Sequence, residues 1–255
     1  MMQATASPPA VRVTGLRKRY GRRAVLHGVD LEVPPGEAFG LVGANGAGKT
    51  TLIKCVLDLC GYQAGEIRLF GAAAAEPRSR TRLAYVPERF APPHYLRCGE
   101  FLATMVELAG GRYEARRARE MFEALELDPA ALARPVRELS KGMTQKLGLA
   151  WCFLLERELY VLDEPMSGLD PAARAAVKGL LRRLRENGRA LLFTSHVLAD
   201  VEELCGAMAV IDDGRLAFRG APAALRERYG QASLEQAFMQ CIREGRRDGG
   251  SAELR

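Results

Sequence analysis

The segment "LVGANGAGKTT", residues 41–51, constrains the fold of this 255-residue chain more than any other. It follows an apolar run and precedes residues with helical spacing, which is the context required of a glycine-rich loop that binds phosphate between a strand and a helix. Glycine allows successive backbone N–H groups to point inward at an anion. The alternative is a chance glycine-rich turn, and the spacing and both flanks argue against it. The segment therefore predicts an α/β nucleotide-binding core.

The residues of this loop provide several kinds of phosphate ligand. Lys49 places a positive charge where the β- and γ-phosphates of a nucleoside triphosphate lie, and the Thr50 hydroxyl is placed to bind Mg²⁺. The Thr51 hydroxyl is expected to reach the α-phosphate. We count Lys49 among the catalytic residues as well. The nucleotide is expected to contact the whole loop, that is Gly43, Ala44, Asn45, Gly46, Ala47, Gly48, Lys49, Thr50 and Thr51.

Two acidic residues end the apolar run "LYVLDEP", residues 159–165. A carboxylate at the C-terminal end of such a strand can hold Mg²⁺ through a water molecule, so Asp163 is expected to bind the metal. Glu164 is the candidate that polarises the attacking water. The alternative is a solvated loop after a strand, where acidic residues are common. Together with the upstream loop, the pair predicts a nucleoside triphosphatase.

Of the three histidines, His196 has a functional context. It follows the apolar run "LLFTS" and is expected beside the phosphate site, where its ring can donate to the γ-phosphate or orient the water. We therefore predict a catalytic role for His196. His27 and His94 have no comparable context and are interpreted as ordinary turn or surface residues.

The order of predicted strands and helices indicates an α/β fold. Apolar or alternating runs predict strands in the first 71 residues, and helical spacing dominates from about residue 90 to 156. Strands then alternate with helices, which are predicted over 171–186 and 197–205. The predicted fold is a P-loop NTPase core, a mostly parallel sheet with flanking helices plus N-terminal antiparallel strands, with an inserted helical subdomain.

The same pattern predicts the domain boundaries. We expect an N-terminal extension over residues 1–10, a nucleotide-binding domain over 11–230 with its helical subdomain at about 91–156, and a C-terminal tail over 231–255. The last segment, "REGRRDGGSAELR", is polar and contains glycine. We expect it to be frayed or disordered.

Composition argues against several other classes of protein. Hydrophobic residues make up 48% of the chain, enough for a sizeable core, and the six cysteines form no C-x-x-C pair, which disfavours a zinc ribbon or a disulfide framework. The sequence contains no signal-peptide pattern and no apolar run near the roughly 18 residues that span a bilayer. We expect a soluble, intracellular protein. The net charge of +6 indicates an ordinary solvated surface, and no nucleic-acid partner is expected.

These residues and four further motifs resemble the nucleotide-binding subunits of ATP-binding cassette (ABC) proteins over residues 11–230. "LSKGM" is similar to the family's LSGGQ signature, "SGLDP" to its D-loop, and "TSH" to the segment with the switch histidine. "LRKRYG" resembles the segment whose aromatic residue stacks on adenine. Each motif is short, but their order and spacing together are specific. The resemblance implies that the domain binds ATP and Mg²⁺, and it adds four nucleotide contacts: Tyr20, Ser140, Gly142 and Asp170.

The resemblance also implies partners. In the family two cassettes pair head to tail, so Ser140 and the Gly142 backbone of one copy would contact the γ-phosphate held by a second copy of a homodimer. An ordinary helix N-cap is the alternative for Ser140, and the two roles are compatible. A separately encoded transmembrane permease would hold the chain at the inner, cytoplasmic face of the cell membrane. The helices of residues 91–135 and Glu88 would face this permease. "SKGM" and "SLEQAFM" favour an exporter.

Three positions depart from the family pattern. Lys141 and Met143 replace the usual glycine and glutamine of the signature. Glu88, in "AYVPERF", stands where the family has a glutamine that helps to bind Mg²⁺. A carboxylate is a better ligand for a hard metal than an amide but repels the γ-phosphate, so we expect a metal ligand with an altered rate, the alternative being a surface charge. Two other functions stay open: a non-transport ABC ATPase, and a weakly hydrolysing nucleotide-dependent switch.

Overall fold

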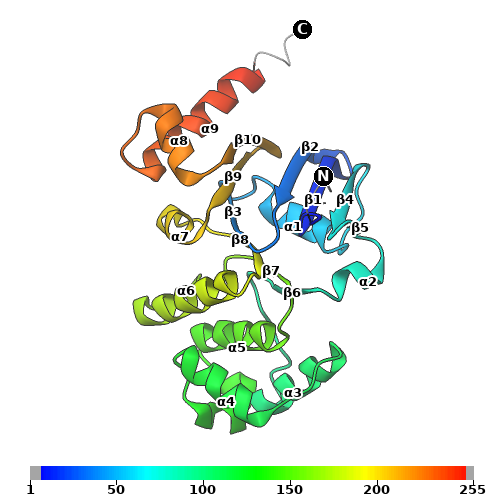
Figure 1. Ribbon diagram of the computed structural model, residues 1–255, viewed down its shortest axis with the longest axis vertical. Coiled ribbons are helices and arrows are strands. Elements are labelled where there is room, and N and C mark those ends of the chain that lie inside the picture. Colours follow the sequence, from blue (N-terminus) through cyan, green and yellow to red (C-terminus); the bar gives the residue numbers. More distant parts are fainter. Residues whose placement is uncertain (1–6, 251–255) are drawn as a thin grey trace, which may run out of the picture.

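The computed structural model describes the backbone of residues 7–250 and the side chains of residues 7–245. Two β-sheets occupy its centre (Figure 1). A helical region lies at one end, and the C-terminal helices α8 (Pro222–Tyr229) and α9 (Leu234–Gly250) lie at the other. The phosphate-binding loop lies in the central part, between these two ends.

The larger sheet has six strands, and its neighbouring strands are parallel except for one antiparallel pair at the β10 edge. Its central strands are fully buried, because helices cover one face and the smaller sheet with α1 covers the other, and they read as continuous apolar runs. In spatial order the strands are β10 (Arg215–Gly220), β9 (Ala207–Asp212), β3 (Ala38–Val42), β8 (Ala190–Thr194), β7 (Leu159–Leu162) and β6 (Leu83–Val86).

The smaller sheet comes from the N-terminal part of the chain and is antiparallel throughout. In spatial order its strands are β2 (Arg23–Val33), β1 (Val11–Tyr20), β4 (Ala64–Leu69) and β5 (Ala72–Ala73). Buried and exposed residues alternate along the first part of β1, as expected of a strand with one covered face. The predicted fold class, with its antiparallel N-terminal strands, is confirmed.

Alternate side chains of the large sheet point into two separate apolar cores. Phe39 of β3 and Val161 of β7 pack in the core shared with the small sheet and with α1 (Lys49–Val56). Tyr160 and Leu162 of β7 point the other way, into the core shared with the helical region. Because successive side chains of a strand point to opposite faces, the same strands contribute to both cores.

The helical region spans most of the interval predicted to be helical. It contains α3 (Cys98–Leu108), α4 (Ala115–Ala124), two 3₁₀ turns and α5 (Lys141–Leu154). Phe90 joins this region to the end of β6, because its ring stacks on Trp151 with centroids 6.3 Å apart and packs on Gly148 of α5. The short α2 (Pro77–Arg80) precedes β6.

Two predicted helices are confirmed and one prediction about the tail is wrong. The helix expected at 171–186 is α6 (Pro171–Glu186), and that expected at 197–205 is α7 (Leu198–Leu204). The segment from residue 243 is not frayed over its described part, because α9 continues to Gly250. Leu234, Ala237, Cys241 and Ile242 of α9 are buried and anchor it. Residues 1–6 and 251–255, which belong to the predicted extension and tail, lie outside the described residues.

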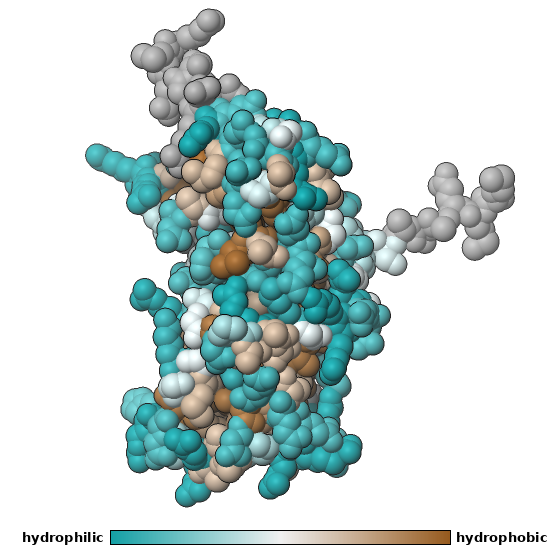
Figure 2. Space-filling model, turned by 90° about the vertical axis from the view of Figure 1, so that its left-hand side faces the viewer, coloured by the Kyte–Doolittle hydropathy of each residue, from teal (hydrophilic) through white to brown (hydrophobic). Residues whose placement is uncertain are grey.

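None of the helices in the described chain combines the length and the apolar character that a membrane-spanning helix needs. The face drawn in Figure 2 is mostly hydrophilic, and small apolar areas lie between charged side chains.

Candidate nucleotide-binding site

The loop between β3 and α1 has the backbone geometry of a phosphate cradle. Gly48 precedes the helix with φ of 113°, in the left-handed region, where a side chain would be strained. Gly43 has another constraint, since a Cβ there would lie 2.3 Å from the carbonyl oxygen of Ile211. The Lys49 ammonium donates to the carbonyl oxygens of Gly43, at 2.6 Å, and Ala44, at 3.3 Å. The Lys49 ammonium group is thus held inside the predicted phosphate-binding loop.

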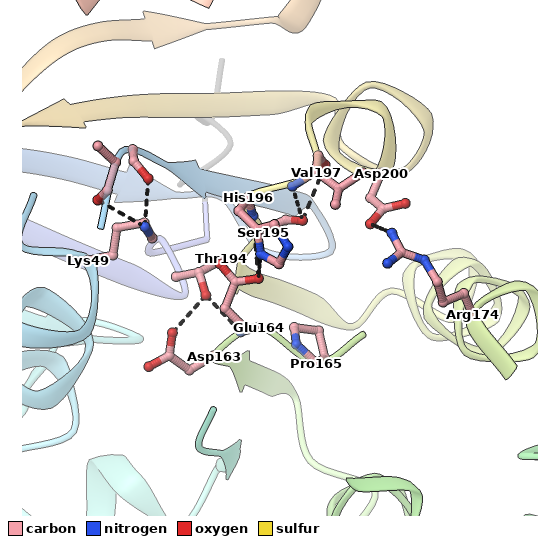
Figure 3. Close-up of polar contacts among 12 residues, drawn as sticks. Lys49, Asp163, Glu164, Pro165, Arg174, Thr194, Ser195, His196, Val197 and Asp200 are labelled. Carbon is pink, nitrogen blue, oxygen red and sulfur yellow. Dashed lines mark hydrogen bonds and ion pairs between the residues drawn. The ribbon is translucent and has the colours of Figure 1, made fainter. Parts of the chain in front are cut away.

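The loop forms one wall of a cavity of about 480 Å³. The other walls come from β2 and from the segments that follow β6, β7 and β8, so parts of the chain far apart in sequence converge here (Figure 3). The lining residues are Val25, Ala44, Asn45, Gly46, Gly48, Lys49, Thr50, Thr51, Glu88, Asp163, Glu164, Ser167 and His196.

Two carboxylates stand at the C-terminal end of β7 and are fixed by a single hydroxyl. Thr194 Oγ1 donates to Asp163 Oδ1, at 2.7 Å, and accepts the N–H of Glu164, at 2.8 Å. The backbone N–H of Asp163 also donates to the carbonyl oxygen of Val86. Glu164 has a positive φ of 50°, an unfavourable conformation for a residue with a side chain, and the Thr194 bond helps to hold it.

His196 contacts the second carboxylate directly. Its Nδ1 lies 2.7 Å from Glu164 Oε2, and its backbone N–H donates to the same oxygen at 3.4 Å. The Glu164 side chain is largely buried, whereas that of His196 is exposed. The ring therefore lies at the mouth of the cavity and covers the carboxylate (Figure 3).

The segment that carries His196 is fixed by its neighbours. Ser195 Oγ accepts the N–H of Val197 at 3.0 Å, which closes a turn immediately before α7. Asp200, buried in α7, forms ion pairs with Arg174, at 2.6 Å, and Lys178, at 2.9 Å, both on α6. These contacts hold α7 against α6 and give the histidine a defined position.

The donor set at the bottom of the cavity fits a divalent cation. Asp163 is buried, and its Oδ2 atom has no hydrogen-bond partner in the described structure. A buried carboxylate oxygen without a donor is destabilising, so it favours a cation or a bound water. Thr50 and Glu88 line the same cavity, which brings the three predicted metal ligands together. Burial raises the pKa of nearby Tyr85 to about 12, and the Asp163 charge contributes to this increase.

Several predicted nucleotide contacts do not line this cavity. Ser140 caps α5, where its Oγ accepts the N–H of Met143 at 3.2 Å, and Gly142 follows in the first turn. Asp170 caps α6 by accepting the N–H of Ala173 at 2.9 Å, a bond that lowers the pKa of the carboxyl group.

The remaining predicted contacts lie close to the cavity or within its loop. Tyr20, at the end of β1, is about half exposed, and its hydroxyl contacts Cys60 Sγ at 3.7 Å. Gly43 and Ala47 belong to the loop, but they are buried behind its lining.

The sequence interpretation missed Thr194, Val25 and Ser167. Thr194 stands two residues before His196 at the end of an apolar run, a position that marks it as facing the same site as the Asp163 carboxylate. Val25 and Ser167 carry no comparable pattern in the sequence.

The fold and the site define a P-loop protein that binds nucleoside triphosphates. Comparison with known proteins narrows this class. The family described as "ABC transporter" matches residues 26–167. The chain belongs to this family of ATP-binding proteins.

The chain is similar to proteins of several bacteria. It is 37% identical over 201 residues to an uncharacterized ABC transporter ATP-binding protein of Synechocystis, and the match spans 78% of this chain and 57% of that protein. A Nod factor export ATP-binding protein I of Paraburkholderia xenovorans is 38% identical, with 85% of this chain and 72% of that protein covered.

Solved structures agree with this fold. One described as the ATP binding subunit of an ABC transporter has a TM-score of 0.85 and 32% identity, and the match covers 91% of this chain and 99% of that one. A bacterial Atm1-family ABC exporter with ATP bound, at 21% identity, has the same fold over 93% of this chain and 43% of its own, with a TM-score of 0.79.

Proposed function

We propose that this chain is the subunit of an ABC transporter that binds and hydrolyses ATP. The observation that carries the proposal is the convergence of Lys49, Asp163, Glu164 and His196 on one cavity beside the glycine-rich loop. A loop of N–H donors with an ammonium group binds a polyphosphate, and a carboxylate beside it activates water. Hydrolysis needs both parts, and a protein that only binds nucleotide needs the first alone.

Each residue has a role in this reaction. Lys49 exchanges its carbonyl contacts in the loop for the β- and γ-phosphates, which bind an ammonium group more strongly than neutral carbonyls do. Glu164 orients and polarises the water that attacks the γ-phosphorus. When the imidazole of His196 is protonated both ring nitrogens donate, so Nδ1 can bond Glu164 while Nε2 is free to donate to the γ-phosphate.

Mg²⁺ bound with the nucleotide would neutralise charge on the β- and γ-phosphates. Thr50 and Asp163 would hold it, with Glu88 as the further ligand in place of the family's glutamine. The free Oδ2 atom of Asp163 supports this assignment. Oxygen donors of this kind are the ligands that Mg²⁺ prefers.

The predicted contacts outside the cavity support a head-to-tail homodimer. Ser140 is exposed at the start of α5, and the residues that line the phosphate cavity do not include it. A second copy could therefore present Ser140, the Gly142 backbone and the Asp170 region to the γ-phosphate that this copy binds. Tyr20 would stack on the adenine from the copy that holds the phosphates.

A separately encoded membrane permease is proposed as the second partner, at the cytoplasmic face of the membrane. Relatives named for Nod factor export and the similarity to a structure described as an ATP binding subunit support this arrangement. The name of those relatives also supports export as the direction of transport. The helical region and Glu88 would face the permease, so the nucleotide state could reach it through the Phe90 contact with α5.

Glu164→Gln tests the hydrolytic role. We expect this variant to bind ATP and to form a dimer with saturating MgATP, because the phosphate ligands stay in place, while turnover falls by at least roughly a hundredfold. Steady-state phosphate release and light scattering coupled to size exclusion measure the two properties. The control is Glu186→Gln, an exposed carboxylate at the end of α6 and outside the cavity, which should leave both unchanged.

Two results would contradict the proposal. Normal turnover in Glu164→Gln would remove Glu164 from the reaction. A variant that stays monomeric with bound MgATP would refute the head-to-tail dimer and leave the hydrolytic site intact.

A further inference from the structure

A thiol pair lies at the other end of the phosphate-loop helix. Cys55 is in the last turn of α1, and Cys60 is in the segment that leads to β4. Their Sγ atoms are 3.5 Å apart, which is within contact distance for two sulfurs. A disulfide bond is about 2.05 Å long, so the sulfurs need to approach by about 1.5 Å to form one.

The backbone between the two cysteines is a tight turn that keeps them together. The N–H of Asp58 donates to the carbonyl oxygen of Cys55 at 3.0 Å, and the N–H of Leu59 donates to that of Lys54 at 2.8 Å. Asp58 has a positive φ of 57°. The thiol contact is therefore fixed by the ordered end of α1.

The two thiols differ in access. Cys55 is buried, and burial raises the pKa of its thiol to about 12. Cys60 is partly exposed, so a reagent from solvent reaches it first. This division suits a two-step oxidation, in which an accessible sulfur is oxidised and a sheltered neighbour then closes the disulfide.

Cys60 also contacts the predicted adenine platform. The Tyr20 hydroxyl donates to Cys60 Sγ at 3.7 Å, and this bond is the first cause of the raised pKa of Tyr20. Lys18 lies 4.4 Å from the centre of the Tyr20 ring and donates to the carbonyl oxygen of Gly61, the residue after Cys60. A displacement of Cys60 would therefore change the contacts of both Lys18 and Tyr20 at the end of β1.

We propose that Cys55 and Cys60 form a modification site at which a peroxide closes a disulfide, and that closure withdraws Cys60 from Tyr20 and weakens nucleotide binding. The last part rests on the proposed function, since it needs adenine to stack on Tyr20. The Tyr20 contact is already long at 3.7 Å, so we expect the shift of the Cys60 sulfur on closure to break it.

The chemistry balances with one peroxide molecule. The Cys60 sulfur attacks a peroxide oxygen, the O–O bond breaks, and the released oxygen leaves as water with the thiol proton, giving a sulfenic acid. The Cys55 sulfur then attacks the Cys60 sulfur, the S–O bond breaks, and a second water leaves with the Cys55 proton. The two thiols lose two electrons, and the peroxide is reduced to two water molecules.

Peptide mass spectrometry after peroxide treatment tests the first part. Trypsin cuts after Lys54 and Arg68, so both cysteines fall in one peptide. We expect this peptide to lose two hydrogen atoms, to resist alkylation, and to be restored by a dithiol reductant. Cys55→Ser should instead accumulate a sulfenic acid at Cys60, whereas the four other cysteines, all buried, should stay reduced.

Nucleotide affinity tests the second part. We expect peroxide to weaken ATP binding by the full chain roughly two- to tenfold, the range expected for loss of one aromatic contact. Cys60→Ser, whose hydroxyl can still accept from Tyr20, should bind ATP equally before and after treatment.

Three outcomes separate the possibilities. Oxidation of the exposed Met239 to a sulfoxide shows that the peroxide has acted on the chain. If both thiols can still be alkylated at that point, the proposed modification site is refuted. A complete disulfide with unchanged ATP affinity overturns its link to Tyr20. A reduced wild-type chain that binds no ATP refutes the proposed function, and the peptide result still decides whether the pair oxidises.

Discussion

Removing one hydroxyl, in Thr194→Val, tests how the two carboxylates of the proposed catalytic site are held. Thr194 is fully buried, and the substitution deletes its bonds to Asp163 Oδ1 and to the N–H of Glu164. A bond to a charged group contributes about 1.5–3 kcal/mol and a neutral one about 0.5–1.5 kcal/mol. We therefore expect the free energy of unfolding to fall by about 2–4.5 kcal/mol and the melting temperature by about 4–18 °C.

The same substitution should also affect turnover, because the bond to Thr194 helps to keep Glu164 at its unfavourable positive φ. We expect kcat for ATP to fall roughly ten- to hundredfold, the effect of a small misplacement of a reacting group. The KM should change by less than about twofold, since the phosphate loop is untouched. Denaturant titration and steady-state phosphate release measure the two effects.

Two controls isolate the hydroxyl of Thr194. Thr194→Ser keeps the hydroxyl and should retain most of the activity. Thr81→Val removes a threonine hydroxyl that donates to the Arg78 carbonyl oxygen and does not line the cavity, and should leave kcat unchanged. If Thr194→Val unfolds within about 0.5 kcal/mol of the wild type and keeps its kcat, the bridge does not position the carboxylates and the argument is refuted.

Three further substitutions probe the scaffold. Gly148→Ala places a Cβ 2.8 Å from the Phe90 ring, so we expect it to lower the free energy of unfolding by about 1–3 kcal/mol. Gly179→Ala, in open space on α6, should raise the free energy of unfolding by about 0.5–1 kcal/mol. If denaturant titration gives both changes the same sign, the packing of Gly148 on Phe90 is contradicted. Arg82 lowers the pKa of Glu158 below its ordinary value of 4.5, so their bond stabilises the fold above that pH and is lost as the pH falls through the lowered pKa. Glu158→Gln should be slightly less stable than the wild type at pH 7 and equal to it in acid; a difference that persists in acid would show another cause.

The sequence was most informative where local chemistry decides the structure. Asp170 followed by Pro171 marks the start of α6, because aspartate is a good N-cap and proline suits the first helical turn. Asn187 and Gly188 then end it. The glycine spacing of the phosphate loop was equally decisive, since the close approach at Gly43 excludes a side chain there.

The sequence was less informative where distant contacts decide. β6 is only four residues long and half buried, and it becomes a strand through pairing with β7. The tail was predicted from its polar composition to be frayed, yet α9 continues to Gly250 because Leu234 and Cys241 anchor the helix on the fold. The pairing of β6 has no local pattern that could have predicted it, whereas the buried residues of α9 have the spacing of one helix face, a signal that the polar composition of the tail outweighed in the prediction.

The contact between the two thiols could not be predicted from the sequence for a similar reason. Cys55 and Cys60 are five residues apart, a spacing that corresponds to no metal or redox motif. A turn with a positive φ at Asp58 brings them together, and aspartate in that conformation is uncommon enough to escape prediction from the sequence.

The start of α5 shows how one residue can both cap a helix and bind an anion. As a cap, the Ser140 oxygen accepts the N–H of Met143, which uses a lone pair and leaves the hydroxyl proton free. That proton can be donated to a phosphate, together with the unpaired N–H groups of the first turn, and no acidic residue within the first turn of α5 opposes the anion. Ser140 does not line the cavity beside Lys49, so in the proposed head-to-tail dimer it would contact the triphosphate that a second copy binds. We therefore expect Ser140→Ala to keep α5 within about 1 kcal/mol of its stability but to abolish the MgATP-dependent dimer of Glu164→Gln, as measured by light scattering. A dimer that survives this substitution at wild-type affinity would place the γ-phosphate contact elsewhere.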